Sequence, residues 1–208
     1  MGAYAPIFHF WITHIMTTQY IVDANYRFIA AYQEVNTRIA QRQQALSLYA
    51  TLILSLLAAL VALKPASGAG VPVEWLLPGF PAASFCLVFL NYKGERAISN
   101  LRSFLSSLEQ LNNAHEYLPS YNTHPQWSQG ANKARRFHDL TALLLVIAGN
   151  GIGLGAAIHI YPDRLAVAPA VVWGSVVIAV LSVVVLLLVP RWSYTPSENI
   201  NQTNDNND

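Results

Sequence analysis

Four long runs without a charged residue constrain this chain more than any other feature of its sequence. They cover residues 45–63, 75–92, 140–161 and 169–189, and each is about 20 residues long. An apolar helix needs about 20 residues to cross a hydrocarbon layer about 30 Å thick. Only 11% of the 208 residues are charged and 53% are hydrophobic, too little polar surface to bury four such helices in a soluble protein. The sequence therefore predicts an all-α integral membrane protein with four transmembrane helices.

The distribution of Lys and Arg predicts how these helices are oriented. Of the 12 Lys and Arg residues, only Lys64 and Arg164 fall in the two short connections, residues 64–72 and 161–168. The other ten lie at the opposite ends of the runs, and cations concentrate on the cytoplasmic side of a bilayer. We expect two antiparallel hairpins in a bacterial inner membrane, with both termini in the cytoplasm. The formal net charge is only +1, so direct binding of nucleic acid is not expected.

About half of the chain lies outside these runs and has its own helical pattern. Apolar residues recur every three or four positions along residues 21–46, where Asn25 and Arg42 interrupt them, and again along residues 98–111. No Pro or Gly separates the first of these stripes from the first run, so one helix is expected from about residue 18 to residue 63. The two stripes either pack on each other or partly face another subunit. We divide the chain into a cytoplasmic amphipathic helix (1–44), a transmembrane hairpin (45–92), a cytoplasmic helix and loop (93–139), a second transmembrane hairpin (140–189) and a disordered cytoplasmic tail (190–208).

Small residues in the third run and prolines in the second are the main features within the expected spans. Glycines four positions apart let helix backbones approach closely, and here two such pairs point in different directions. An amide side chain at this depth is costly to expose to lipid, so Asn150 is expected to bond a neighbouring helix or to face a polar path. Pro78 and Pro81 are expected to kink the second span. The residues expected at a helix contact or a pore are Gly149, Asn150, Gly151, Gly153 and Gly155.

The cytoplasmic segment before the third run offers candidate contacts with other molecules. Residues 119–130 are rich in Pro, Asn, Ser and Gly and predict a loop. Its Tyr121 and Trp127 are candidates for contact with a soluble cytoplasmic partner, although such a Trp also commonly folds back on its own helices. The cations that follow fit a collar for anionic lipid headgroups, which the orientation rule alone also explains: Lys133, Arg135 and Arg136.

Little in the sequence points to catalysis. The six His residues lack the spacing of a helical metal site, Cys86 is the only cysteine, and no ionisable residue lies deep within a run. We therefore expect no catalytic residue, cofactor or metal site, and a non-enzymatic protein. A small transporter, or an interfacial membrane enzyme that uses His115, His124 and His138, is the less favoured alternative.

One resemblance adds to these expectations. A cytoplasmic helix with Tyr26-Arg27, Arg38 and Arg42 that runs into an apolar hairpin, residues 46–92, resembles the small bacterial membrane effectors of the SLATT type. The four-span layout is also similar to the membrane sensor of the Kiwa defence system. The resemblance implies an oligomeric, membrane-perturbing effector or membrane sensor in anti-phage defence, with a cytoplasmic bundle that couples it to a signal. A membrane anchor that recruits a soluble partner is the alternative.

Overall fold

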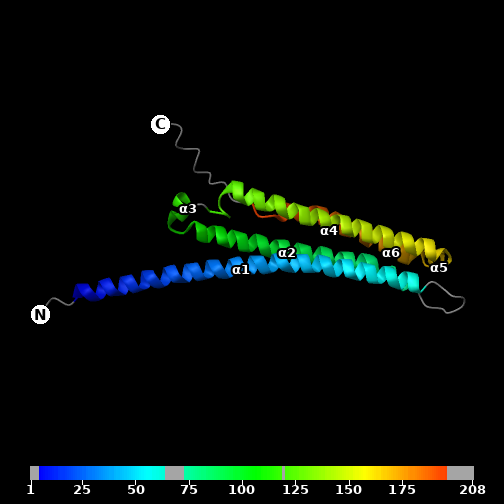
Figure 1. The fold of residues 1–208 in the computed structure, drawn as a ribbon, viewed down its shortest axis with the longest axis horizontal. Coiled ribbons are helices and arrows are strands. Elements are labelled where there is room, and N and C mark those ends of the chain that lie inside the picture. The colour runs from blue at the N-terminus through cyan, green and yellow to red at the C-terminus, as the bar shows by residue number, and fades with distance from the viewer. Residues whose placement is uncertain (1–4, 64–72, 119, 196–208) are drawn as a thin grey trace, which may run out of the picture.

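The described part of the chain is built from helices. The computed structural model describes the backbone of residues 5–63, 73–118 and 120–195, with the side chains of these residues from 24 onward except at residues 73 and 134. Every regular element in these ranges is helical, which confirms the all-α prediction (Figure 1). In chain order the elements are α1 (Ala5–Ala62), η1 (Val73–Trp75), α2 (Gly79–Glu109), η2 (Leu111–Asn113), α3 (Ala114–Tyr117), α4 (Pro125–Ile160), α5 (Pro162–Val167), α6 (Pro169–Leu188) and η3 (Val189–Trp192).

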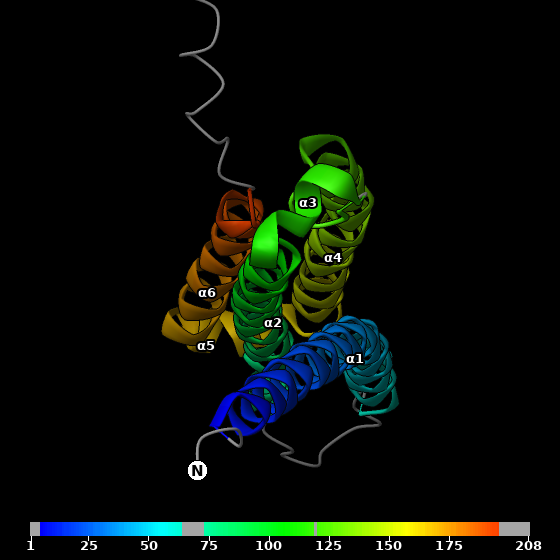
Figure 2. The ribbon, with the colours of Figure 1, turned by 90° about the vertical axis from the view of Figure 1, so that its left-hand side faces the viewer.

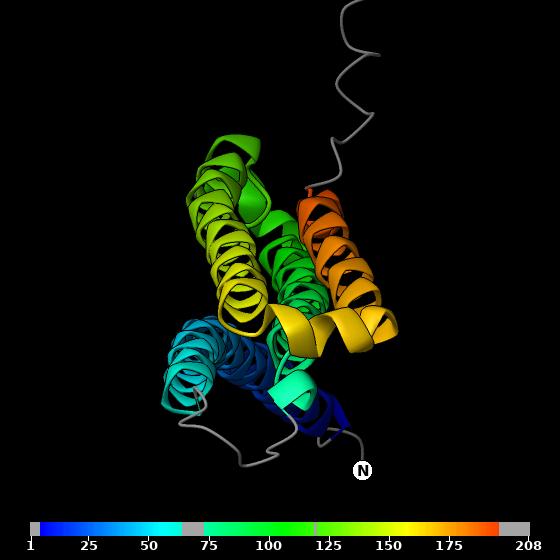
Figure 3. The ribbon, with the colours of Figure 1, turned by 90° about the vertical axis from the view of Figure 1, so that its right-hand side faces the viewer.

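The four long helices α1, α2, α4 and α6 run alternately up and down along one axis (Figure 1). Viewed from the end that carries α3, α2 lies between α1, α4 and α6 and contacts all three (Figure 2). At the opposite end, the short helix α5 bridges α4 and α6 (Figure 3). Contacts pair Arg42 with Asp139 and Tyr161 with Leu60, so α1 and α4 are parallel. The first and last described residues therefore lie toward the same end of the bundle.

Helix α1 is a single uninterrupted rod of 58 residues. This confirms the expected continuity through residue 62, and the helix begins earlier than residue 18, at Ala5. Pro6 lies in its first turn, where the missing N–H has no partner to lose. The remaining residues of the helix contain neither Pro nor Gly, so no residue favours a break.

Helix α2 begins at Gly79, so Pro78 directly precedes the helix and Pro81 lies in its first turn. The N–H groups of a first turn have no acceptor within the helix, so proline is accommodated there without distortion. The kink expected at these two prolines is therefore replaced by a helix start. The uncharged part of α2, residues 79–92, is consequently only about 21 Å long at 1.5 Å per residue.

The expected loop over residues 119–130 also needs correction. The loop expected over residues 119–130 ends earlier, because α4 begins at Pro125. His124 is extended, with φ −76° and ψ 124°, the conformation favoured before a proline, and proline suits the first helical position. Gly130 and Trp127 therefore lie in a helix.

The expected disordered tail is folded over its first residues. The rings of Trp192 and Tyr92 meet edge to face with centroids 5.0 Å apart. The Ser99 hydroxyl donates a hydrogen bond to the backbone oxygen of Trp192 at 3.0 Å. These contacts dock residues 189–194 on α2, whereas residues 196–208 of the predicted tail lie outside the described residues.

Among the described residues, three helices are long and apolar enough to cross a membrane: Ala24–Ala62 within α1, Pro125–Ile160 (α4), and Pro169–Trp192, which combines α6 and η3. Three buried apolar clusters follow one another along the described part of the bundle. One surrounds Tyr49, Phe80 and Val146, and the second surrounds Leu60, Leu77 and Ala157. The third joins Ala31 and Val35 of α1 to Leu105 of α2. The composition of these helices supports a membrane protein with several spans.

Candidate functional site

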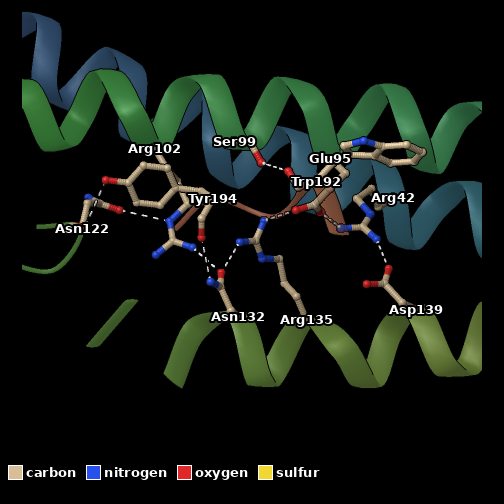
Figure 4. A network of polar contacts seen from close by, with 10 residues as sticks. All are labelled: Arg42, Glu95, Ser99, Arg102, Asn122, Asn132, Arg135, Asp139, Trp192 and Tyr194. Atoms are coloured by element: carbon tan, nitrogen blue, oxygen red, sulfur yellow. Dashed lines mark hydrogen bonds and ion pairs between the residues drawn. The ribbon is translucent and has the colours of Figure 1, made fainter. Parts of the chain in front are cut away.

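Four charged side chains from three helices meet where the long apolar part of the bundle ends (Figure 4). Arg42 Nη1 donates a hydrogen bond to Glu95 Oε2 at 2.9 Å, and Arg42 Nη2 donates one to Asp139 Oδ1. Arg135 Nη1 donates to the other oxygen of Glu95 at 3.0 Å. We call these residues the charge network: Arg42 of α1, Glu95 of α2, and Arg135 and Asp139 of α4.

The charge network is almost completely shielded from solvent. The side chains of Arg42 and Glu95 are 6% and 1% exposed, and that of Asp139 is 10% exposed. Burial of a charge is unfavourable unless an opposite charge and hydrogen bonds compensate it, and each member here has such a partner. The network therefore holds α1, α2 and α4 together at one level of the bundle.

A glycine makes room for the network. A Cβ atom at Gly94 would lie 3.1 Å from Cγ and 3.2 Å from Cδ of Arg42. The aliphatic part of Arg42 therefore crosses α2 at a glycine, which has no side chain to block it. Helix α2 continues through Gly94 without a break.

Arg102 extends the polar cluster but lacks a carboxylate partner. Its Nε donates to Asn122 Oδ1 at 3.2 Å, and its Nη1 donates to Asn132 Oδ1 at 2.8 Å. Its guanidinium also lies over the ring of Tyr194, 5.3 Å from the centroid. The residue is 4% exposed, and its Nη2 has no hydrogen-bond partner among the described residues (Figure 4). Burial, with a smaller effect of neighbouring Arg135, lowers the pKa of Arg102 below its ordinary value, although a guanidinium stays protonated near neutral pH.

The turn before α4 is anchored by one carboxylate. Glu109 accepts hydrogen bonds from the backbone N–H of Asn122 and from that of Thr123, each at 3.0 Å to Oε2. It also accepts from Asn122 Nδ2 at 2.9 Å and from the Thr123 hydroxyl at 3.0 Å. These bonds fix the amide of Asn122 in position to accept from Arg102.

A pocket of about 690 Å³ opens between α1, α2, α4 and this turn. We call it the cytoplasmic pocket, after the side on which its residues are expected. Its apolar wall comes from α1 and α2, and its polar part includes Arg42, Arg102, Arg135 and His138. Arg42 Nε, Arg102 Nη2 and His138 Nε2 are buried and have no hydrogen-bond partner among the described residues. The residues of the apolar wall are Phe28, Tyr32, Val35, Ile39, Ile98 and Leu105.

A second, uncharged polar cluster lies deeper in the bundle. The Tyr49 and Ser84 hydroxyls are 3.0 Å apart, and Asn150 Nδ2 donates to Ser84 Oγ at 2.7 Å and to the Val146 carbonyl at 2.8 Å. Asn150 is 4% exposed, so it joins α4 to α2 inside the bundle.

The glycines beside Asn150 face two different environments. A Cβ at Gly149 would lie 2.7 Å from the Tyr49 hydroxyl, and one at Gly153 would lie 2.3 Å from the Phe80 ring. Cβ atoms at Gly151 and Gly155 would meet no neighbouring atom within 4 Å in the part of the chain that the structure describes. One pair therefore lies at contacts within the bundle and the other lies on its outer surface.

The remaining predicted site residues are dispersed. Lys133 and Arg136 are exposed, but Arg135 points inward to Glu95 and so does not belong to a surface collar. Tyr121 lines the cytoplasmic pocket and is half-exposed; Trp127 is half-exposed on α4. The sequence-based expectations did not include the charge network or Arg102. The one available signal was Arg42, which interrupts an otherwise apolar stripe.

The chemistry of the described residues does not suggest a metal centre. Within the described ranges, no group of three or more His, Cys, Asp or Glu side chains is close enough to hold a metal ion.

Comparison with protein-family models, curated proteins and solved structures gives no significant match to this chain. The charge network, the cytoplasmic pocket and the apolar helices are therefore the features that indicate a function.

Proposed function

We propose that the chain is a non-enzymatic bacterial inner-membrane protein with four spans, in which a cytoplasmic helical bundle senses a signal and couples it to the membrane. The observation that carries this proposal is the buried charge network, which joins α1, α2 and α4 next to the apolar segments. The similarity in layout to SLATT-type effectors supports a role in anti-phage defence.

The bundle topology supports a fourth span in α2. Helices α1 and α4 are parallel, and both are long and apolar enough to cross a membrane. If both cross in the same direction, the chain must return through the membrane between them, and α2 is the long helix that makes this return. Its central position also explains why it tolerates more polar residues, since other helices cover much of its surface.

The charge network supports coupling rather than simple anchoring. Removal of one partner from a buried ion pair costs about 3–5 kcal/mol, because it leaves the other charge uncompensated. Movement of the cytoplasmic half of α1 that shifted Arg42 would therefore draw Glu95 and Asp139 with it. The adjoining apolar segments of α2 and α4 would move in turn.

The native Cys86 tests membrane insertion of α2. This exposed thiol lies in the uncharged part of α2, within the expected second span. In intact inner-membrane vesicles we expect a charged, membrane-impermeant maleimide to leave Cys86 unmodified until detergent is added. An Asn112→Cys variant made in a Cys86→Ser background should react at once in inside-out vesicles. Equal rapid labelling of Cys86 before and after detergent would rule out the fourth span.

Hydrogen exchange tests the coupling. In nanodiscs, Arg42→Gln should increase amide exchange in α2 and α4 on both sides of the charge network. The matched control is Arg38→Gln, which breaks an exposed pair with Glu34 one turn away on the same helix. If the two variants change exchange only in α1, the proposed coupling is wrong.

A membrane-perturbing homo-oligomer is a second candidate, favoured by the outer surface of α4. Gly151 and Gly155 are exposed there, spaced so that another helix can approach closely. Gly151→Leu combined with Gly155→Leu should shift the protein toward monomer in detergent, as measured by light scattering. Gly174→Leu on α6, where a Cβ also meets no neighbouring atom among the described residues, is the control. A wild-type monomer, or an oligomer that the double variant leaves intact, would remove this candidate.

A further inference from the structure

We propose that the cytoplasmic pocket is a binding site for an amphiphilic phosphate, a ligand with one phosphate group on an apolar body. The proposal names the ligand class of the sensor proposed above and rests on that function only for the biological role of binding. A phosphate joined to a less polar body occurs in an anionic phospholipid from the inner leaflet and, with the face of an aromatic base in place of acyl chains, in a soluble nucleotide. The pocket lies between these two sources, because Arg42 is three residues before the expected start of the first span.

Arg102 supplies the main observation. It is 4% exposed and lines the pocket, yet its hydrogen-bond acceptors are two neutral amide oxygens. One of its nitrogens, Nη2, is buried and has no hydrogen-bond partner among the described residues. Burial of a cation with an unpaired donor is unfavourable, and an anion bound beside it would remove that cost.

A second guanidinium lies beside it. Asn132 Oδ1 accepts hydrogen bonds from Arg102 Nη1 at 2.8 Å and from Arg135 Nη2 at 2.6 Å, so one neutral oxygen holds two cations together. Glu95 offsets the charge of Arg135, but Arg102 has no carboxylate of its own and is repelled by the guanidinium beside it. Phosphate oxygens suit such a pair, since guanidinium groups bind phosphate through several parallel N–H donors.

The carboxylates around the pocket are already engaged. Glu95 and Asp139 neutralise Arg42 and Arg135 within the charge network. Glu109 is occupied by the turn, where it accepts bonds from Asn122 and Thr123. Arg102 is thus the cation of the pocket without a carboxylate partner in the part of the chain that the structure describes.

The opposite wall fits an apolar body. Tyr32 and Ile39 of α1 are 52% and 39% exposed although they line the pocket, and buried Ile98 and Leu105 of α2 face them. The volume of about 690 Å³ falls within the roughly 300–1,000 Å³ typical of small-molecule sites. Inorganic phosphate alone would leave this wall uncovered, so we expect the apolar body to contribute to affinity.

The test is calorimetric titration of the full-length chain in detergent with defined probes. These are monomeric dihexanoyl phosphatidic acid, adenosine monophosphate, inorganic phosphate and, as the zwitterionic control, dihexanoyl phosphatidylcholine. We expect phosphatidic acid or the nucleotide to bind at least tenfold more tightly than the other two probes. Preference for phosphatidic acid identifies the membrane as the source of the ligand, and preference for the nucleotide identifies a soluble source. If neither binds more tightly than phosphatidylcholine, the proposal is wrong.

Two kinds of variant make the test specific to this pocket. Arg102→Gln should weaken binding at least tenfold, whereas Lys133→Gln, which removes an exposed cation of α4, should change it less than twofold. Tyr32→Ala and Ile39→Asp alter half-exposed wall residues, so they should weaken binding of the amphiphile while the thermal midpoint stays unchanged. The proposed site is wrong if Arg102→Gln and Lys133→Gln change the affinity equally and the two wall variants leave it unchanged.

These titrations are independent of the coupling experiment. Binding in detergent needs neither membrane insertion nor movement of α1. If the probes do not bind, but Cys86 stays protected and Arg42→Gln increases amide exchange in α2 and α4, only the pocket ligand is rejected. The opposite pattern would reject the proposed function and leave the binding site in place.

Discussion

Gly94 of α2 lies directly against the side chain of Arg42 of α1, with only 3.1 Å between the position of a Cβ atom at residue 94 and Cγ of Arg42. The next residue along α2, Glu95, accepts a hydrogen bond from the guanidinium of the same arginine. One position therefore provides space for the aliphatic part of Arg42, and its neighbour provides the counter-charge. The two adjacent residues act together on Arg42, from which the first prediction follows.

A bulky residue at position 94 should expel Arg42 from the charge network. We expect Gly94→Leu to lower the free energy of unfolding by about 3 kcal/mol, because Glu95 and Asp139 would lose a buried partner. The midpoint of thermal unfolding in detergent would record this as a fall of several degrees. Gly130→Leu in α4 is the control, since a Cβ there meets no neighbouring atom within 4 Å among the described residues. An equal midpoint for both variants would show that Arg42 tolerates displacement.

Loss of the charge of Glu95 should be far more damaging than loss of a similar charge at the surface. Glu95 pairs with two arginines at 1% exposure, so Glu95→Gln should reduce stability by about 3 kcal/mol. Glu34 pairs with Arg38 in an exposed position on α1, and Glu34→Gln should change stability by less than about 0.5 kcal/mol. Chemical denaturation monitored by Trp fluorescence distinguishes the two. Similar losses would mean that the buried pairs contribute little.

The glycines of α4 should respond differently to the same substitution. Gly153→Ala places a Cβ 2.3 Å from the Phe80 ring, so α2 and α4 must move apart, at a cost of about 1–3 kcal/mol. Gly151→Ala meets no neighbouring atom among the described residues and should be neutral or stabilising by up to about 1 kcal/mol through helix propensity. Thermal midpoints of the two variants in the same detergent provide the comparison. A lower thermal midpoint for Gly151→Ala would show instead that the outer surface at residue 151 makes a close contact.

Removal of the Glu109 carboxylate should release the turn before α4. Glu109→Ala takes away the acceptor for the backbone N–H groups of Asn122 and Thr123, and bonds to a charged acceptor contribute about 1.5–3 kcal/mol. Limited proteolysis should then cut between α3 and α4 at least several times faster than in the unchanged protein. Glu116→Ala, at an exposed position of α3, is the control. Unaltered cleavage in the Glu109 variant would show that other contacts hold the turn.

The helices were predictable from the sequence because their signals are local. An uninterrupted α1 follows from a long segment without internal Pro or Gly, and the amphipathic stripes follow from spacings of three and four residues. The start of α2 also has a local signal, since prolines are tolerated in the first turn of a helix. The absence of charge conceals this signal, because an uncharged run does not show where within it a helix begins.

The charge network could not be predicted in the same way. Its members are separated by 53, 97 and 40 positions in the pairs Arg42–Glu95, Arg42–Asp139 and Arg135–Glu95. Their contact depends on which faces of three helices meet, and a small shift in helix register would separate them. In the sequence, Glu95 and Arg102 resemble the solvent-exposed charges around them, and Arg42 resembles a defect in an apolar stripe. Burial, which distinguishes them, is a property of the packed bundle.

The unbroken length of α1 has a mechanical consequence. From Ala5 to Arg42 the helix extends about 55 Å, and from Arg42 to Ala62 about 30 Å, at 1.5 Å per residue. Ala31 and Val35 pack on Leu105 before Arg42, and Tyr49 and Ile53 pack in the bundle after it, so the helix is held on both sides of the charge network. A stiff helix held along this length moves as one body, so a displacement of the part before Arg42 would also displace the part that packs against the apolar helices.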